Sequence, residues 1–238
     1  MNRTLELFKE RKYEIEFYYT ILEKLNSPNT KINIINDPLF EQILKSNFLL
    51  MLYNLIEACI TTGFIEIYEA IENNRNSYID LTPEFQKIWS DYKISSPPES
   101  TAKQSTYRKI VQEILDDVIK NKPIEFDTSS QINFTKNVLR IGGNLDARAI
   151  KNLLQKHNIT VSDKSEKSRM LIIRQKRNQL AHGEDSFGNS MRDFTILDLK
   201  DYKEEVLNFI DSILISMKEY YDNECYLLSA KKAVSKKK

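Results

Sequence analysis

Hydrophobic and polar residues follow a helical period through most of the chain. Between residues 4 and 25, hydrophobic side chains recur at spacings of mostly four, which predicts a helix with these side chains on one face: Leu7, Tyr13, Phe17, Ile21 and Leu25. Similar patterns predict further helices over residues 38–73, 82–93, 101–120, 144–159, 170–182 and 195–228. Only five glycines and six prolines interrupt the chain. We therefore expect an all-α fold, a helical bundle with long helices and one small inserted segment.

Local signals place the ends of several helices. Asp37 followed by Pro38 has the residue types of an N-cap and a first helical position, so the second helix is expected to begin there. Residues 61–63, Thr-Thr-Gly, are a candidate kink within it. Residues 27–31 and 95–100 predict breaks or loops, and residues 161–168 should contain the N-cap of the helix over 170–182.

Residues 123–163 have a different character. The sequence QINFTKNVLRIGG, residues 131–143, alternates and is rich enough in β-branched residues to predict a short strand or hairpin closed by Gly142 and Gly143. We interpret residues 123–163 as an insertion between two helices of one bundle. The chain is then expected to form a single domain over residues 1–230, followed by a basic disordered tail over residues 231–238.

Composition and charge limit the classes of partner. The chain has 238 residues, 41% hydrophobic and 29% charged, with a net charge of +1, so any basic patch for nucleic acid must be local. The most apolar stretch, residues 48–68, carries Asn54, Glu57 and Glu66, which are costly at the centre of a bilayer, so we expect a buried core helix. The charged N-terminal residues do not resemble a signal peptide. We expect a cytoplasmic protein with no membrane partner.

No residue pattern indicates a metal or a cofactor. Cys59 and Cys225 lie in apolar helical patterns and are expected to be buried free thiols. His157 has no second histidine or cysteine at ligand spacing, and we expect it to be an ordinary surface residue at a helix end. The sequence contains no phosphate-binding glycine loop and no hydrolase or kinase motif.

The heptapeptide RNQLAHG, residues 177–183, is the unusual feature of the chain. On an ideal helix, four hydrophobic residues form a stripe roughly 100° wide: Met170, Ile173, Leu180 and Ala181. Arg177 falls inside this stripe. Arg174, Asn178 and His182 are spaced four apart on the adjacent flank, and Gly183 suits the left-handed position just past a helix end.

The charge in the stripe has two interpretations. A buried guanidinium is costly unless it is paired or borders a cleft. In the first interpretation Arg177 extends to solvent or pairs with a core carboxylate, for which Glu57 is available. In the second, Arg177 and His182 border a pocket and act together on a phosphate.

The motif resembles the signature of the HEPN superfamily, R-x(4–6)-H. Arg177, Asn178 and His182 supply its arginine, polar residue and histidine. The longer sequence RNQLAHGEDSF is similar to the HEPN branch associated with restriction-modification and phage-defence loci, in which a Ser-Phe pair and an acidic-capped last helix follow the motif. Corresponding features are Ser186-Phe187 and Asp198, the segments 10–25 and 47–58, and the insert GNLDARAIKNLL.

The resemblance implies a HEPN-like helical bundle that dimerises and, in active members, cleaves RNA without a metal. The residues suit that chemistry. His182 can act as acid or base near neutral pH. Arg177 offers a permanently charged fork to phosphate oxygens, and Asn178 can orient a water, the histidine or the substrate.

The resemblance also implies partners. Arg177 and His182 lie about 140° apart on an ideal helix, so two copies across a two-fold axis would bring both pairs to one cleft. Glu57 and Arg174 would support the site, while Lys176 and Arg192 would contact the RNA backbone. The predicted function is an endoribonuclease acting in phage defence or as a toxin, with an antitoxin or defence-system partner. The alternative is a catalytically silent HEPN module that binds RNA, a nucleotide or a protein.

Overall fold

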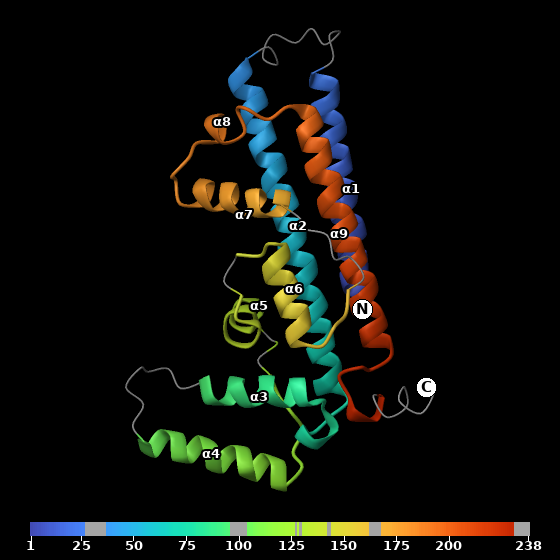
Figure 1. Ribbon diagram of the computed structural model, residues 1–238, viewed down its shortest axis with the longest axis vertical. Helices are drawn as coiled ribbons and strands as arrows, with labels where there is room; N and C mark the ends of the chain where they lie inside the picture. Colours follow the sequence, from blue (N-terminus) through green and yellow to red (C-terminus); the bar gives the residue numbers. More distant parts are fainter. Residues whose placement is uncertain are drawn as a thin grey trace.

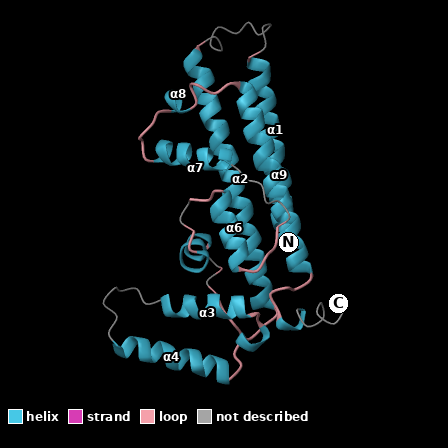
Figure 2. Ribbon diagram, viewed as in Figure 1, coloured by secondary structure: helices cyan, strands magenta, loops and turns pink. Residues whose placement is uncertain are grey.

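A computed structural model describes residues 1–26, 37–95, 104–126, 128, 130–141, 144–161 and 168–230. Most of these residues are helical, and none of them forms a strand, which confirms the all-α prediction (Figure 2). Two isolated β-bridges, Ser77 with Pro123 and Leu81 with Leu227, are the extended pairings found in this part of the chain. The predicted loop over 27–31, Gly142 and Gly143, and the basic tail lie outside the described residues.

Three long helices form the bundle. They are α1 (Asn2–Leu25), α2 (Pro38–Asn73) and α9 (Ile196–Asp222), which run side by side (Figure 1). By length and composition α2 could cross a membrane, but 67% of its most apolar 18-residue window is buried inside the fold. Burial against α1 and α9 therefore accounts for its hydrophobicity.

Side-chain caps begin two of these helices where the sequence predicts. The Asp37 carboxylate accepts a hydrogen bond of 2.8 Å from the backbone N–H of Leu39, and Thr195 and Asp198 form a capping box at the start of α9. α9 ends at Asp222, earlier than predicted. α2 continues through residues 61–63, where a Cβ on Gly63 would lie 2.8 Å from Cε of Met217. Glycine at this position therefore allows α2 and α9 to approach closely.

The buried face of α1 differs from the one that the sequence pattern singled out. Tyr13, Phe17 and Ile21 are 72%, 60% and 38% exposed. The core is contacted by residues that follow a heptad-like period instead: Phe8, Ile15, Tyr19 and Leu22. Residues spaced strictly four apart shift by about 40° around the helix at each step. Such a row therefore contacts one neighbouring helix for no more than about two turns.

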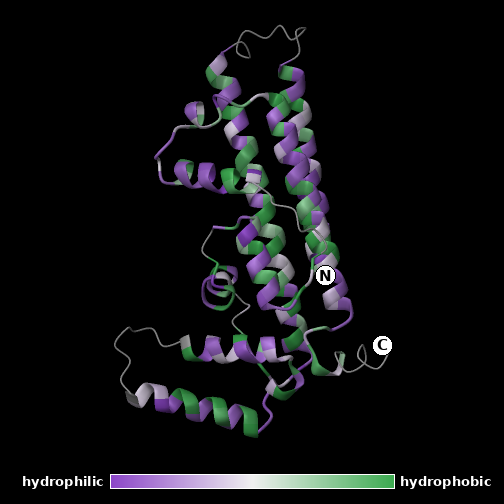
Figure 3. Ribbon diagram, in the orientation of Figure 1, coloured by the Kyte–Doolittle hydropathy of each residue, from purple (hydrophilic) through white to green (hydrophobic). Residues whose placement is uncertain are grey.

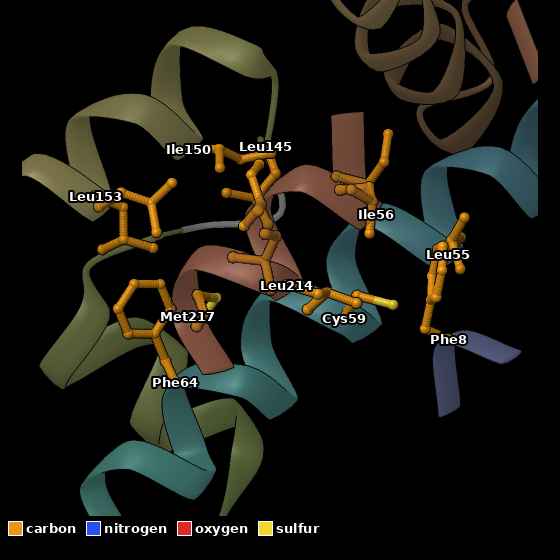
Figure 4. Close-up of a cluster of buried hydrophobic side chains, with 14 of the residues drawn as sticks. Phe8, Leu55, Ile56, Cys59, Phe64, Leu145, Ile150, Leu153, Leu214 and Met217 are labelled. Carbon is orange, nitrogen blue, oxygen red and sulfur yellow. The ribbon is translucent and has the colours of Figure 1, made fainter. Parts of the chain in front are cut away.

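Smaller helices cover one end and one side of the bundle. η1 (Tyr78–Asp80) is one turn of 3₁₀ helix, and α3 (Pro83–Ser95) and α4 (Gln104–Ile119) lie across one end of α2 (Figure 1). α6 (Ala147–Lys156) lies alongside α2. Figure 4 shows that Leu145, Ile150 and Leu153 pack toward Phe64 of α2 and Met217 of α9. This part of the predicted insertion therefore belongs to the core.

The predicted strand or hairpin at residues 131–143 is wrong. Residues Gln131–Asn133 form one turn of α-helix, α5, and Phe134–Leu139 continue as the π-helix η2. Ser130 caps α5 by accepting a hydrogen bond of 3.3 Å from the N–H of Asn133. Phe134, Val138 and Leu139 are buried at spacings of four and five residues, so packing on the bundle overrides the β-branched composition.

The surface position expected for His157 is also wrong. His157 is the C-cap of α6, but its side chain is buried among Phe64, Phe85 and Tyr68. Its Nδ1 donates to the Leu153 carbonyl at 2.8 Å, which leaves Nε2 to accept from the Tyr68 hydroxyl at 2.7 Å. Burial lowers the pKa of His157 to about 4, so the imidazole is neutral. Cys59 is buried as expected, whereas Cys225 is only half-buried.

Candidate functional site

The helix that carries the heptapeptide is α7 (Ser168–Ala181), which crosses the bundle and projects beyond it (Figure 1). Hydrophobic residues cover its end near α2, and hydrophilic residues its projecting part (Figure 3). Met170 and Ile173 of the predicted stripe are fully buried, whereas Leu180 is half-buried and Ala181 is exposed. The fold of one chain therefore covers only the first half of the stripe.

The end of α7 fixes the backbone of His182. Gly183 has a φ of +70°, and its N–H donates to the carbonyl of Leu180 at 3.3 Å. The N–H of Glu184 donates to the carbonyl of Gln179 at 2.9 Å, which completes a Schellman motif with His182 at the C-cap. The predicted helix end is therefore confirmed. The His182 imidazole is exposed and makes no hydrogen bond to the rest of the described chain.

Arg177 lies against an aromatic ring. Its guanidinium carbon is 4.7 Å from the centre of the Tyr53 ring of α2, and Nη1 donates to Oδ1 of Asn178 at 3.1 Å. The side chain is half-buried. Cation–π contact with a buried ring stabilises a guanidinium at this place in the stripe.

Several residues of the predicted site lie close to Tyr53. Burial raises its pKa, and the nearby Glu57 carboxylate raises it further, while Arg177 and Arg174 act in the opposite direction. Glu57 is half-buried one turn after Tyr53, and the described residues include no ion pair of its own. Glu57 therefore belongs to the surroundings of the site through Tyr53.

A short segment before α6 holds the flank of α7. Leu145 is buried in the core and its N–H points to the Tyr53 hydroxyl at 3.4 Å. On either side of it, Asn144 accepts from Nδ2 of Asn178 at 2.8 Å and Asp146 accepts from Nη1 of Arg174 at 2.6 Å. Asp146 also caps α6 through the N–H of Ala149. Arg174 is therefore a structural cation that ties α7 to this segment.

The two predicted RNA contacts lie in different surroundings. Nζ of Lys176 is 3.6 Å from a carboxylate oxygen of Asp185, so its charge is partly neutralised. Arg192 is exposed after the short helix α8 (Phe187–Ser190). α8 is held to α2 by the Ser46 hydroxyl, which donates to the Phe187 carbonyl at 2.7 Å. The loop that follows the motif is thus anchored to the bundle.

A pocket of about 720 Å³ opens along the flank of α7 that carries Asn178. Its lining combines carboxamides and charged groups around one hydrophobic residue: Asn144, Ile172, Arg174, Gln175, Lys176, Asn178, Gln179 and Glu184. His182 follows Asn178 by one helical turn on the same flank. Within the described ranges, no group of three histidine, cysteine, aspartate or glutamate side chains is placed to hold a metal ion.

The family model described as HEPN_MAE_28990-like HEPN matches residues 2–226, nearly the whole chain. The chain belongs to the HEPN superfamily. No curated protein and no solved structure gives a significant match. HEPN domains are generally associated with RNA and nuclease activity, although many are inactive, so the activity of this HEPN protein must be argued from its own residues.

This HEPN domain brings together some of the predicted site and separates the rest. Four of the predicted residues lie around Tyr53, directly or through one contact: Arg177, Asn178, Arg174 and Glu57. His182 is exposed at the helix end, away from that ring. Tyr53, Asn144 and Asp146 were missed because each looks like an ordinary core or cap residue. The one available signal was the spacing of Tyr53 and Glu57, four apart on α2, which places two polar groups on one face of an apolar helix.

Proposed function

We propose that this HEPN protein is a metal-independent endoribonuclease that uses Arg177, Asn178 and His182. The observation that carries the proposal is an exposed imidazole held at a fixed helix end, five residues from a guanidinium that rests on Tyr53. A helix end that served only the fold would not need a histidine with no hydrogen-bond partner in the described chain beside a restrained arginine.

The reaction begins with attack of an RNA 2′-oxygen on the adjacent phosphorus. The bond to the 5′-oxygen breaks, and the products are a 2′,3′-cyclic phosphate and a 5′-hydroxyl end. One proton must leave the 2′-oxygen and one must reach the departing 5′-oxygen, and imidazole can perform either transfer near neutral pH. Arg177 stabilises the additional negative charge on the phosphorane, and Asn178 orients Arg177 through their hydrogen bond.

The active species in this proposal is a homodimer with its two-fold axis near the projecting half of α7. Arg177 and His182 lie about 140° apart around the helix, so one copy of α7 does not direct both at the same phosphate. The uncovered half of the stripe, Leu180 and Ala181, would be buried by the second copy. Arg177 of each copy would then face His182 of the other, so the cleft would hold two equivalent Arg177–His182 pairs.

The remaining roles follow from position and charge. Lys176 and the exposed Arg192 would contact RNA phosphates on either side of the cleft, and Glu57 and Arg174 would hold Tyr53 and α7 in place. We place the protein in the cytoplasm, in phage defence or as a toxin, with an antitoxin or defence-system partner. This biological assignment rests on the HEPN branch that the motif resembles.

The activity is tested by incubating purified protein with RNA in EDTA. Wild type should cut, while His182→Ala and Arg177→Ala should lose about 100-fold or more of the rate, as removal of an acid–base group or a charge-stabilising donor typically does. Lys200→Ala, an exposed lysine on α9, is the matched control and should cut normally. Equal cutting by wild type and both site variants would indicate a contaminant and overturn the proposal. Binding of labelled RNA without cleavage would favour the silent module.

A further inference from the structure

The pocket on the flank of α7 has an unusual lining for a site that needs only to hold phosphate. Four of its lining side chains are carboxamides: Asn144, Gln175, Asn178 and Gln179. Asn144 and Asn178 hydrogen-bond to each other. The amides of Gln175 and Gln179 make no hydrogen bond to any described residue, although each presents a donor and an acceptor to the pocket.

Neither cation of the pocket is left for a base edge, because Arg174 is paired with Asp146 and Lys176 is assigned above to an RNA phosphate. Arg174 donates to Asp146 at 2.6 Å, and Lys176 lies 3.6 Å from Asp185. Guanine is typically recognised by a free arginine or lysine that donates to its O6 and N7 acceptors, whereas adenine is recognised by an amide that accepts from N6 and donates to N7. The groups left available in this pocket are the amides of Gln175 and Gln179, which match adenine, and the Glu184 carboxylate, which can accept from the amino group of adenine or cytosine.

The pocket is also correctly placed relative to the proposed chemistry. Gln175, Asn178 and His182 lie within about 60° of one another around α7, and Gln179 is adjacent to them. A base in the pocket would bring its own phosphate toward His182, one helical turn from Asn178. A volume of about 720 Å³ is in the range of pockets that bind small molecules, and Ile172 offers a hydrophobic surface to the ring.

We propose that this pocket binds the adenine base of the nucleotide next to the cleaved phosphate, with Gln175 and Gln179 reading its edge. The inference deepens the proposed ribonuclease function and rests on it for the position of cleavage. Binding of the base itself does not require catalysis, so the two can be tested separately.

Binding is measured with the full chain carrying His182→Ala, which keeps RNA intact. The probes are fluorescent oligouridine 9-mers in which the central residue is A, G, C or U. The A-containing probe should bind about tenfold more tightly than the others, the effect of one good amide–adenine pair. Adding Gln175→Leu or Gln179→Leu should abolish the preference, whereas Gln112→Leu, an exposed glutamine on α4, should preserve it. Equal binding of all probes, or a preference unchanged by both site glutamine variants, would overturn the inference.

Mapping of cleavage ends provides the second arm. Wild type should cut next to adenosine, and the two glutamine variants should cut with the same His182 dependence but without this bias. Cleavage that depends on His182 with no base preference would contradict the pocket and leave the ribonuclease proposal intact. Adenine-selective binding with no cleavage would support the pocket and contradict the ribonuclease proposal.

Discussion

The guanidinium of Arg177 lies over the ring of Tyr53, with 4.7 Å between the guanidinium carbon and the ring centre. The two residues belong to α7 and α2 and are 124 positions apart in the sequence, so the contact exists only in the folded chain. It explains how a charge can lie within a hydrophobic stripe. It also restrains the plane of the guanidinium, and the N–H groups at the edge of that plane are the ones that donate to phosphate oxygens.

Two substitutions of Tyr53 should distinguish the contribution of its ring from that of its hydroxyl. Tyr53→Leu removes the cation–π contact, worth about 1 to 2 kcal/mol, and should lower kcat for RNA cleavage about tenfold, with KM changed less. Tyr53→Phe keeps the ring and should remain within about threefold of wild type, because the ring that contacts Arg177 is unchanged and the 3.4 Å hydrogen bond from Leu145 to the hydroxyl is long. Steady-state kinetics with circular dichroism as a folding check would decide. Equal loss in both variants would show that the ring does not position Arg177.

Asp146 should stabilise the fold through two separable contacts. Asp146→Ala removes the cap of α6 and the partner of Arg174, and should cost about 2 kcal/mol in the free energy of unfolding. Asp146→Asn keeps a capping oxygen and should cost about half as much. Urea unfolding of both variants measures this. Equal stability of the Ala and Asn variants would mean that the cap contributes nothing.

The buried His157 should make the protein sensitive to acid. Its pKa is about 4 in the folded chain, below the value of about 6.5 expected when unfolded, so between these pH values the unfolded chain binds a proton that the folded chain does not. The stability that depends on neutral His157 is complete above about pH 6.5 and is lost as the pH falls toward 4. The loss from this residue between pH 7.5 and pH 5 should be about 2 kcal/mol.

The control for this prediction is a side chain that does not titrate. His157→Gln should be less stable than wild type at pH 7.5 because it packs less well among Phe64, Phe85 and Tyr68. Its free energy of unfolding should then fall less than that of wild type between pH 7.5 and pH 5. Urea titrations at both pH values give the difference. Identical falls for the two proteins would show that His157 does not control acid stability.

Lys176 and Arg192 should contribute to RNA affinity without affecting sequence preference. If each contacts one phosphate, alanine substitution should reduce the slope of log Kd against log salt by about 0.7, the value for single-stranded nucleic acid. Asp185→Asn should increase affinity, because it releases Lys176 from its carboxylate partner. Fluorescence anisotropy at several salt concentrations tests all three variants against Lys200→Ala. An unchanged slope for Lys176→Ala and Arg192→Ala would remove both from the interface.

The helices could be predicted from sequence because their signals are local. Hydrophobic period, the caps at Asp37 and Thr195, and the glycine at position 183 are each set by a few neighbouring residues. The face that α1 buries was not predictable in the same way, because it depends on where α2 and α9 lie. Residues 131–139 show the same limitation, since contacts with the bundle, and not local propensity, determine their helical form.

Only the part of the site that belongs to α7 and its C-terminal end could be predicted from the sequence. Arg177, Asn178 and His182 are visible as a motif, but their surroundings come from α2 and from the segment 144–146. Tyr53 could not be identified among the many hydrophobic residues of its helix. Nor could the sequence show that Arg174 is paired with Asp146, because a capping residue and a surface arginine 28 positions apart carry no mutual signal.

The most direct test of the central claim is a mixture of two inactive proteins. Arg177→Ala and His182→Ala are purified separately, unfolded and refolded together at equal concentration, and assayed on RNA in EDTA. If the site combines Arg177 of one subunit with His182 of the other, mixed dimers hold one intact pair, and the mixture should recover about a quarter of wild-type activity on statistical grounds. No recovery, from a mixture shown to contain mixed dimers and with active wild type, would contradict a site shared between two chains.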